Sequence, residues 1–187
     1  MPIDHRMIFL ESNNVKLKVL EETDLIKSDW VGWFNDAERC EDNIHHKYPN
    51  SWENQRNYLE TNSTSKIQLG VVDKQLDSEI CGVISLQDIN LLDGNGHLAI
   101  MLDKSTGNKP EIFIESFSLM LAHGFNEIRL NKICVGSLDE RLIPSLQKLF
   151  NFKHEGVLAK HVYKSGRFRD MYVGAVFADE VMYRHGH

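Results

Sequence analysis

The sequence has 187 residues, 42% of them hydrophobic, and a formal net charge of −6. A chain of this length can bury a hydrophobic core, so we expect one domain over residues 1–187, with a loose C-terminal tail from about residue 181 to residue 187. The acidic balance argues against a nucleic-acid interface or a membrane-surface role, because both need concentrated lysine and arginine, and no apolar stretch approaches the roughly 18 residues of a membrane span.

The chain begins with a predicted strand followed by two short helical segments. Apolar and lysine residues alternate over residues 15–19, which is the two-residue period of a strand. Acidic and hydroxyl side chains at 21–24 then supply caps for a helix. Trp30, Trp33 and Phe34 follow at helical spacing, so we expect an aromatic helix face, which in most proteins belongs to the core.

A polar run over residues 35–50 comes next, and it contains His45, His46 and Tyr48. Pro49 prevents a continuous helix through this run. The sequence leaves two interpretations open: a loop that faces a ligand, and a solvated connection whose histidines have no chemical role.

A helix is predicted over residues 51–61, and strands over 67–72 and 80–87 with a polar turn between them. The two strands form an antiparallel hairpin. Three apolar side chains of the helix are expected to face inward: Trp52, Tyr58 and Leu59.

The most informative stretch runs from His97 to Phe125, a predicted strand followed directly by a helix. Asn108 and Glu111 have the spacing of a capping box, and Pro110 lies in the first turn, where its missing amide hydrogen is not needed. The amide groups at such a helix start suit a phosphate or pyrophosphate, although an ordinary packed α/β unit has the same pattern. The apolar stripe of this helix comprises Phe113, Phe117, Met120, Gly124 and Ile128.

The rest of the chain reads as a strand over 132–136, a helix over 142–150 and a hairpin of strands 157–163 and 171–177. The complete order of elements predicts the α+β class, with a mixed α/β arrangement in which helices cover both faces of one sheet.

The three cysteines are Cys40, Cys81 and Cys134. They lie far apart and lack metal-ligand spacing, so we expect reduced and mostly buried thiols, no metal site and a cytoplasmic protein. Cys134, in the middle of a predicted strand, is interpreted as a core residue.

Six segments of the chain resemble the GNAT superfamily of N-acetyltransferases. The resemblance is nearest to the branch with the ribosomal-protein alanine N-acetyltransferases and the acetyltransferases of amino-sugar pathways. The order and spacing of these six segments carry the resemblance. The segments are VKLKVLEETD from Val15, WVGWFND from Trp30, CGVISLQDI from Cys81, HLAIMLDK from His97, GFNEIRLNKI from Gly124 and LFNFKHEGVLAKHVYKSGRFRDMYVGAVF from Leu149.

The resemblance implies a mostly antiparallel twisted sheet in which two central strands splay apart and hold acetyl-CoA as co-substrate. Its pantetheine would pair with the first of these strands, and its pyrophosphate would lie at the start of the central helix. Carried over to this chain, the cofactor-binding residues are Ile100, Met101, Leu102, Lys104, Asn108, Lys109, Glu111, Ile112 and Phe113.

The chain departs from the family at the pyrophosphate cradle. The family has Gln or Arg, then Gly, then Gly or Ala, where this sequence has Asn108, Glu111 and Phe113. Phe113 obstructs the close approach that glycine allows, Glu111 places a carboxylate at the positive helix end, and Pro110 removes one donor. We therefore expect weakened or reshaped CoA binding. The alternative is a GNAT-like domain without CoA that serves as a ligand-binding or scaffolding module.

The catalytic residues also differ from the family pattern. Many relatives have a tyrosine that protonates the departing thiolate, and Gln147 stands in that segment, where it can donate a hydrogen bond but no proton. His97 replaces a glutamate of the family, and imidazole accepts protons readily near neutral pH. A purely structural hydrogen-bonded His97 remains open, with His161, His45 and His46 as alternative bases.

These residues predict direct acetyl transfer to a primary amine without a covalent enzyme intermediate. An amino sugar, free or nucleotide-linked, is favoured over a protein N-terminus, because aromatic rings and histidines suit sugar stacking and hydroxyl groups. The partner is therefore a small-molecule amine, with no nucleic acid or membrane, and the chain is a monomer or homodimer. The predicted substrate-binding residues are Trp30, Trp33, His45, His46, Tyr48 and His161.

Overall fold

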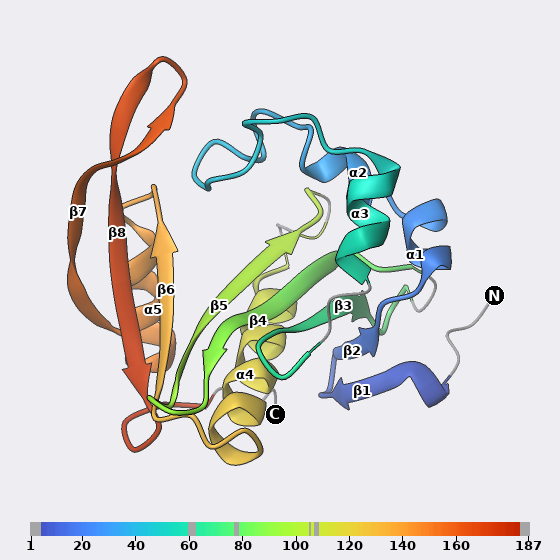
Figure 1. The fold of residues 1–187 in the computed structure, drawn as a ribbon. Helices are drawn as coiled ribbons and strands as arrows, with labels where there is room; N and C mark the ends of the chain where they lie inside the picture. Colours follow the sequence, from blue (N-terminus) through green and yellow to red (C-terminus); the bar gives the residue numbers. More distant parts are fainter. Residues whose placement is uncertain (1–4, 60–62, 77–78, 105, 107–108, 184–187) are drawn as a thin grey trace.

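The structure is a computed structural model, and it describes residues 5–59, 63–76, 79–104, 106 and 109–183 (Figure 1). Eight strands in this part of the chain form one sheet in the order β1-β2-β3-β4-β5-β6-β8-β7. The strands are β1 Ile8–Glu11, β2 Val15–Val19, β3 Ile67–Asp73, β4 Gly82–Asn90, β5 Asn95–Leu102, β6 Lys132–Ser137, β7 Lys153–Lys164 and β8 Arg167–Phe177. The helices are η1 His5–Met7, α1 Glu22–Lys27, α2 Trp30–Trp33, α3 Trp52–Leu59, α4 Pro110–Asn126 and α5 Leu142–Phe150.

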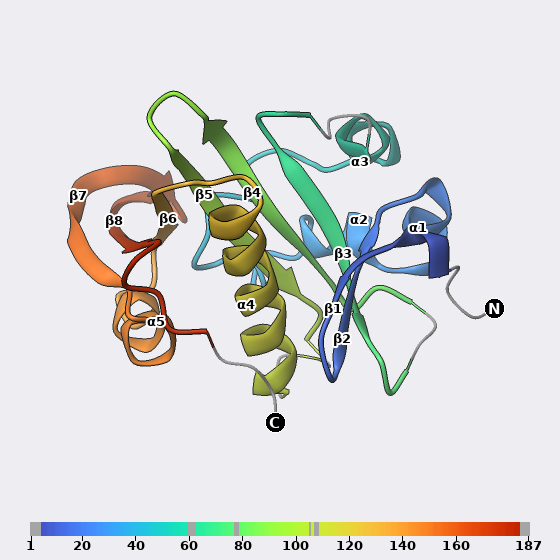
Figure 2. The same cartoon turned by 90° about the horizontal axis from the view of Figure 1, so that it is seen from below.

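All neighbouring strands are antiparallel except β5 and β6, which are parallel. The parallel pair follows from the sequence order, since β5 and β6 are joined through the long helix α4. The predicted α+β class with helices on both faces is confirmed (Figure 2). None of the described helices has the length and apolar character needed to cross a membrane.

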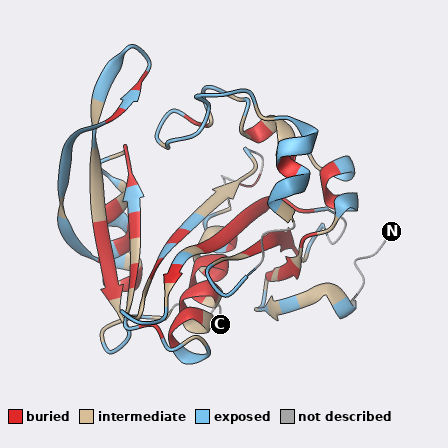
Figure 3. Ribbon diagram, viewed as in Figure 1, coloured by how far each residue is buried: buried red, intermediate tan, exposed pale blue. Residues whose placement is uncertain are grey.

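Two hydrophobic clusters lie on opposite sides of the sheet. The main core joins α4 and α5 to apolar residues of the central strands, and its members include Ile84, Leu98 and Ile133. The second core holds Trp30 and Trp33 of α2 against the other face. Figure 3 shows this burial concentrated in the central strands, whereas much of the β7–β8 hairpin is exposed.

The structure corrects the predicted inward face of α3. Gln55 is its buried residue, while Trp52 and Tyr58 are 53% and 46% exposed. Gln55 turns inward because its side-chain oxygen accepts a hydrogen bond from Asn50 Nδ2 at 2.7 Å, so a polar contact sets the face of this helix. Leu59 packs against the second core, as predicted.

The C-terminal segment is more ordered than the predicted loose tail from 181 onward. Val181 and Tyr183 pack against the main core, and the Met182 amide donates to the Phe150 carbonyl at 3.3 Å. Residues 184–187 lie outside the described part of the chain. The sequence reading also missed β1, because its four residues are too short to show a clear alternation.

Glu115 of α4 fastens this helix to the turn between β1 and β2. Its side chain is 3% exposed and accepts hydrogen bonds from Ser12 Oγ at 2.6 Å, the Asn14 amide at 2.9 Å and Asn14 Nδ2 at 2.7 Å. Burial alone would raise the pKa of Glu115, but these hydrogen bonds outweigh it and hold the pKa below its ordinary value of 4.5.

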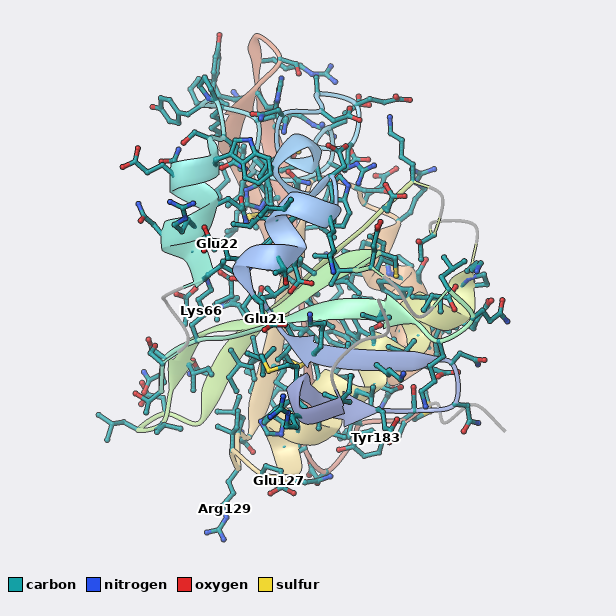
Figure 4. The ribbon with its side chains drawn as sticks, turned by 90° about the vertical axis from the view of Figure 1, so that its right-hand side faces the viewer. Glu21, Glu22, Lys66, Glu127, Arg129 and Tyr183 are labelled. Carbon is teal, nitrogen blue, oxygen red and sulfur yellow. The ribbon has the colours of Figure 1, made fainter. Side chains whose placement is uncertain are left out.

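We expect Glu115→Gln to lower the free energy of unfolding at neutral pH by about 2 kcal/mol, because three partly buried donors lose a charged acceptor. The folded-state pKa is depressed, so this contribution is present above pH 4.5 and is lost as the pH falls through the folded value. Urea unfolding at several pH values measures the effect. The control is Glu127→Gln, at the exposed end of α4 (Figure 4). An equal loss of stability at pH 3 and pH 7 would contradict the role of the charge.

Candidate active site

The central feature of the site is the point where β5 and β6 separate. The two strands pair only at Asn95 with Lys132, Gly96 with Ile133 and His97 with Cys134. Beyond this point β5 stays paired with β4 as far as Leu102, and β6 stays paired with β8 as far as Ser137. We call the diverging segments, residues 98–102 of β5 and 135–137 of β6, the fork (Figure 1).

His97 lies at the closed end of the fork. Its neighbour Leu98 is buried in the main core, so strand alternation directs His97 to the opposite face of the sheet. The imidazole is 55% exposed, and its Nδ1 lies 3.7 Å from Asp88 Oδ2. Asp88 reaches this position from an irregular stretch of β4, where it adopts a φ of 51°. An Nδ1 that faces a carboxylate leaves Nε2 as the proton-accepting nitrogen.

Cys134 is the register partner of His97 on β6, and it too lies opposite the main core side of its strand. Burial raises the pKa of the Cys134 thiol, although nearby Lys132 acts in the other direction. The thiol is therefore protonated at neutral pH, which makes it a weak nucleophile.

Two polar residues of β4 that the sequence analysis missed complete this face. Gln87 is the register partner of His97, and its Nε2 donates to Ser85 Oγ at 3.1 Å. Ser85 is in turn the partner of Ala99 in β5. The strand periodicity could have placed Ser85 and Gln87 beside His97, once the pairing of β4 with β5 was considered.

The start of α4 differs from its predicted capping box. The N-cap is Lys109, whose side chain forms no capping hydrogen bond, and Pro110 is the first helical residue. Asn108 lies outside the described residues. The Ile112 amide already donates to the Lys109 carbonyl at 3.1 Å, and Pro110 has no amide hydrogen. This helix start therefore presents fewer open donors than most helices do.

The side chains predicted for the pyrophosphate cradle have separate positions in the first turn of α4. Glu111 is exposed, whereas Ile112 is 1% exposed in the main core. The Phe113 ring stacks on Phe117 at 5.2 Å, and Phe117 stacks on Phe150 of α5 at 5.1 Å. Phe113 thus belongs to an aromatic contact between α4 and α5, and the side chain of Ile112 is unavailable to a ligand.

Both lysines predicted to contact phosphate already have acidic partners. The Lys109 ammonium pairs with Asp73, which is 2% exposed, and Lys104 Nζ lies 2.8 Å from Glu38 and 3.0 Å from Asp36. The hydrogen bonds to these carboxylates raise the pKa of each lysine. Each ammonium would have to share or leave its carboxylate in order to bind a phosphate.

The predicted pantetheine edge of β5 lies on the fork. Ile100 and Leu102 pack against the main core and Met101 against the second core, and all three are half-buried. Their side chains fix the strand, while the backbone edge on the side of β6 has no strand partner among the described residues.

The predicted acceptor residues divide into two groups. His45, His46 and Tyr48 line one pocket of about 440 Å³ together with Phe34. Its remaining lining comes from the loop and α3: Ile44, Lys47, Pro49, Asn50, Asn54, Gln55, Asn57 and Tyr58. The His45 ring meets the Phe34 ring edge to face at 4.7 Å, and burial together with nearby Lys164 lowers the pKa of His45.

Trp30 and Trp33 do not belong to this pocket. They are 0% and 2% exposed and pack within the second core. Neither ring is accessible to a ligand, so the prediction that they stack on a sugar is wrong for this structure. His161 is exposed on β7 and does not line the pocket, and Gln147 is exposed on α5. A second cavity of about 570 Å³ lies between the end of β6 and the β7–β8 hairpin, lined by Asp42, Tyr172, residues 138–141 and residues 167–170.

Within the described residues, no three side chains of the types His, Cys, Asp and Glu gather as a metal ion would require.

No protein-family model matches the sequence, and no curated protein matches it either. Solved structures do match. The ribosomal L7/L12 alpha-N-protein acetyltransferase RimL in complex with coenzyme A is similar with a TM-score of 0.79 and 17% identity, over 92% of this chain and 99% of that one. The Vibrio cholerae spermidine N-acetyltransferase in complex with CoA and spermine gives 0.76 and 18%, over 89% and 97%.

A crystal structure described as a putative acetyltransferase matches with a TM-score of 0.71 and 24% identity, over 91% of this chain and 87% of that one. These matches cover nearly the whole of the described sheet and its helices. The mixed α+β sheet with one parallel pair and helices matches the fold of these proteins. The chain has the fold of the GNAT N-acetyltransferases.

Proposed function

We propose that this protein is an acetyl-CoA-dependent N-acetyltransferase that acts on a primary amine. The observation that carries the proposal is the fork, where a strand edge without a partner leads to the start of a long helix. Two proteins that share the fold are described as complexes with CoA, and both are N-acetyltransferases by name.

The residues at the fork fit such a co-substrate in part. The open backbone edge of β5 at residues 98–102 can pair with the amide groups of pantetheine as an added strand would. The start of α4 can receive a pyrophosphate, but Pro110 and the bonded Ile112 amide leave it few donors. We therefore expect acetyl-CoA to bind mainly through the strand edge and with reduced affinity.

The chemistry assigned to this chain is a proton transfer at His97. Acetyl-CoA, when bound, supplies the thioester that the neutral amine attacks. His97 Nε2 accepts the proton that the amine must lose, while Nδ1 lies 3.7 Å from Asp88 Oδ2. Gln147 has no ionisable proton to give, so the departing thiolate takes its proton from water and His97 returns its own proton to the solvent. The protonated thiol of Cys134 agrees with transfer that needs no covalent intermediate.

For the acceptor we propose an amino sugar, free or nucleotide-linked, bound in the pocket of His45, His46 and Tyr48. That pocket combines aromatic rings with carboxamide side chains, which suits sugar faces and hydroxyl groups. Its lining contains no carboxylate, although the chain carries 27 acidic residues. A polycation would favour a pocket with carboxylates, so the lining supports a sugar over a polyamine.

A second candidate function, a binding module without CoA, is supported by Pro110 and by the engagement of Lys109 with Asp73. Thermal unfolding with acetyl-CoA separates the two. We expect a stabilisation of about 2.7 kcal/mol once the ligand reaches 100 times its dissociation constant. S-acetylpantetheine, which lacks the pyrophosphate and the nucleotide, and desulfo-CoA, which lacks the thiol, serve as comparisons for the pyrophosphate end and the thiol end. An unchanged melting temperature at millimolar acetyl-CoA would support the binding module.

His97→Ala should lower kcat/KM by about 10²–10⁴-fold, which is the usual contribution of a general base. The decline of the rate toward acid pH should also disappear, since it reports protonation of the base. Initial rates of thiol release from pH 5 to pH 9 measure both effects. His154→Ala, an exposed histidine of β7, is the control. A variant with normal turnover and a normal pH profile would show that His97 is not the base.

Acceptor choice is tested with a panel of nucleotide-linked amino sugars, polyamines and N-terminal peptides, assayed by thiol release. We expect the amino sugars to give the highest kcat/KM, and Tyr48→Ala to raise their KM without changing the KM for acetyl-CoA. Trp52→Ala is the matched control, because Trp52 is an exposed aromatic residue that does not line the pocket. Faster acetylation of peptides or polyamines would reject the sugar assignment.

A further inference from the structure

The segment of residues 36–45, which we call the strap, spans the open end of the fork. It is fastened first to the end of β5. Arg39 Nη2 lies 3.0 Å from Asp103 Oδ1, and its Nη1 donates to the Leu102 carbonyl at 3.4 Å. Lys104, just beyond β5, pairs with Asp36 and Glu38 of the strap.

The same strap is fastened to the end of β6 and to β8. The Leu138 amide donates to the Asp42 carbonyl at 3.0 Å. Arg169 of β8 donates to the Glu41 carbonyl at 2.8 Å and the Leu138 carbonyl at 3.1 Å, and it pairs with Asp42 at 3.2 Å. The strap therefore links the ends of both fork strands.

Lys164 makes the most buried of these attachments. Its ammonium donates to the carbonyl of Cys40, to that of Asn43 at 2.8 Å and to that of His45 at 2.7 Å. An ammonium has three donors, so these carbonyls satisfy all of them. The residue is 7% exposed, and burial lowers the pKa of Lys164.

The position of Lys164 is fixed by the β7–β8 turn. Ser165 and Gly166 have φ values of 51° and 79°, the left-handed geometry of a tight two-residue turn, and Lys164 pairs with Arg167 across it. The turn holds the side chain at the tip of the β7–β8 hairpin. His45, the last strap residue, both accepts from Lys164 and lines the 440 Å³ pocket.

We propose that Lys164 is a positioning residue for acetyl transfer: it holds the strap across the open end of the fork and so sets the affinity for the amine acceptor. The inference rests on the proposed function. Lys164 touches neither acceptor nor co-substrate in this role. It acts through the backbone of residues 40–45, whose last two residues, Ile44 and His45, line the acceptor pocket.

The test uses Lys164→Met, which keeps the length of the side chain and removes the ammonium, in the full chain. We expect faster hydrogen exchange at residues 40–45 and an amine KM raised at least tenfold, with kcat and the KM for acetyl-CoA within about twofold of wild type. Arg169→Gln removes a separate set of contacts to the same strap. It should likewise speed hydrogen exchange at residues 40–45 and raise the amine KM. Lys160→Met, exposed on β7, is the control.

Unchanged exchange in both variants would overturn the inference, as would a loosened strap with an unchanged amine KM. A general loss of structure in Lys164→Met would appear as faster exchange in the central strands too, and Arg169→Gln then decides the question. Wild-type protein that neither binds acetyl-CoA nor acetylates any amine would overturn the proposed function itself, and this inference with it.

Discussion

Three register pairs between β5 and β6 hold the two halves of this sheet together. Beyond these pairs each strand stays paired with its other neighbour, β5 with β4 and β6 with β8, so the sheet keeps its integrity while the two central strands diverge. Backbone donors and acceptors along the fork then lack the partners that a strand normally provides. The helices behind the fork and the strap in front of it lie around these unpaired backbone groups.

Behind the fork, helix packing maintains the separation. Helix α4 covers β2, β4, β5 and β6, whereas α5 lies against the β7–β8 hairpin. The stacked rings of Phe113, Phe117 and Phe150 join the two helices. Closing the fork would move the halves of the sheet relative to each other and break these close-packed contacts, which proteins resist strongly. In front, the strap bridges the same two halves through arginine and lysine side chains.

The sequence predicted the elements whose pattern is local. The predicted helix 142–150 coincides with α5, and the strands β2, β3, β4 and β6 were found within a few residues, because apolar periodicity and turn residues act over short distances. The faces of helices were predicted less well. Hydrophobicity alone turned Trp52 and Tyr58 inward, and it did not reveal that Asn50 would hold Gln55 inside.

The residues of the candidate site also differ in how far the sequence indicated them. His97 was predicted from the resemblance to the acetyltransferase family, because it replaces a glutamate there, and the structure places it at the closed end of the fork. Asp88, its ionic partner, owes its position to an irregular stretch of β4 that no periodicity indicates. The contacts of Lys164 with the strap join residues 119 to 124 positions apart, and such contacts leave no trace in a local pattern.

Charge near the fork leads to a further constraint on ligand binding. Five cationic side chains near the open end of the fork and the strap are each already engaged by a carboxylate, a carbonyl or both: Arg39, Lys104, Lys109, Lys164 and Arg169. An anionic ligand at the start of α4 must therefore bind through backbone amides, or compete with partners such as the buried Asp73. Removing a lysine from a buried carboxylate leaves an uncompensated charge, which is costly. Recognition at this site should consequently depend on the shape and hydrogen bonding of the β5 edge more than on attraction between opposite charges.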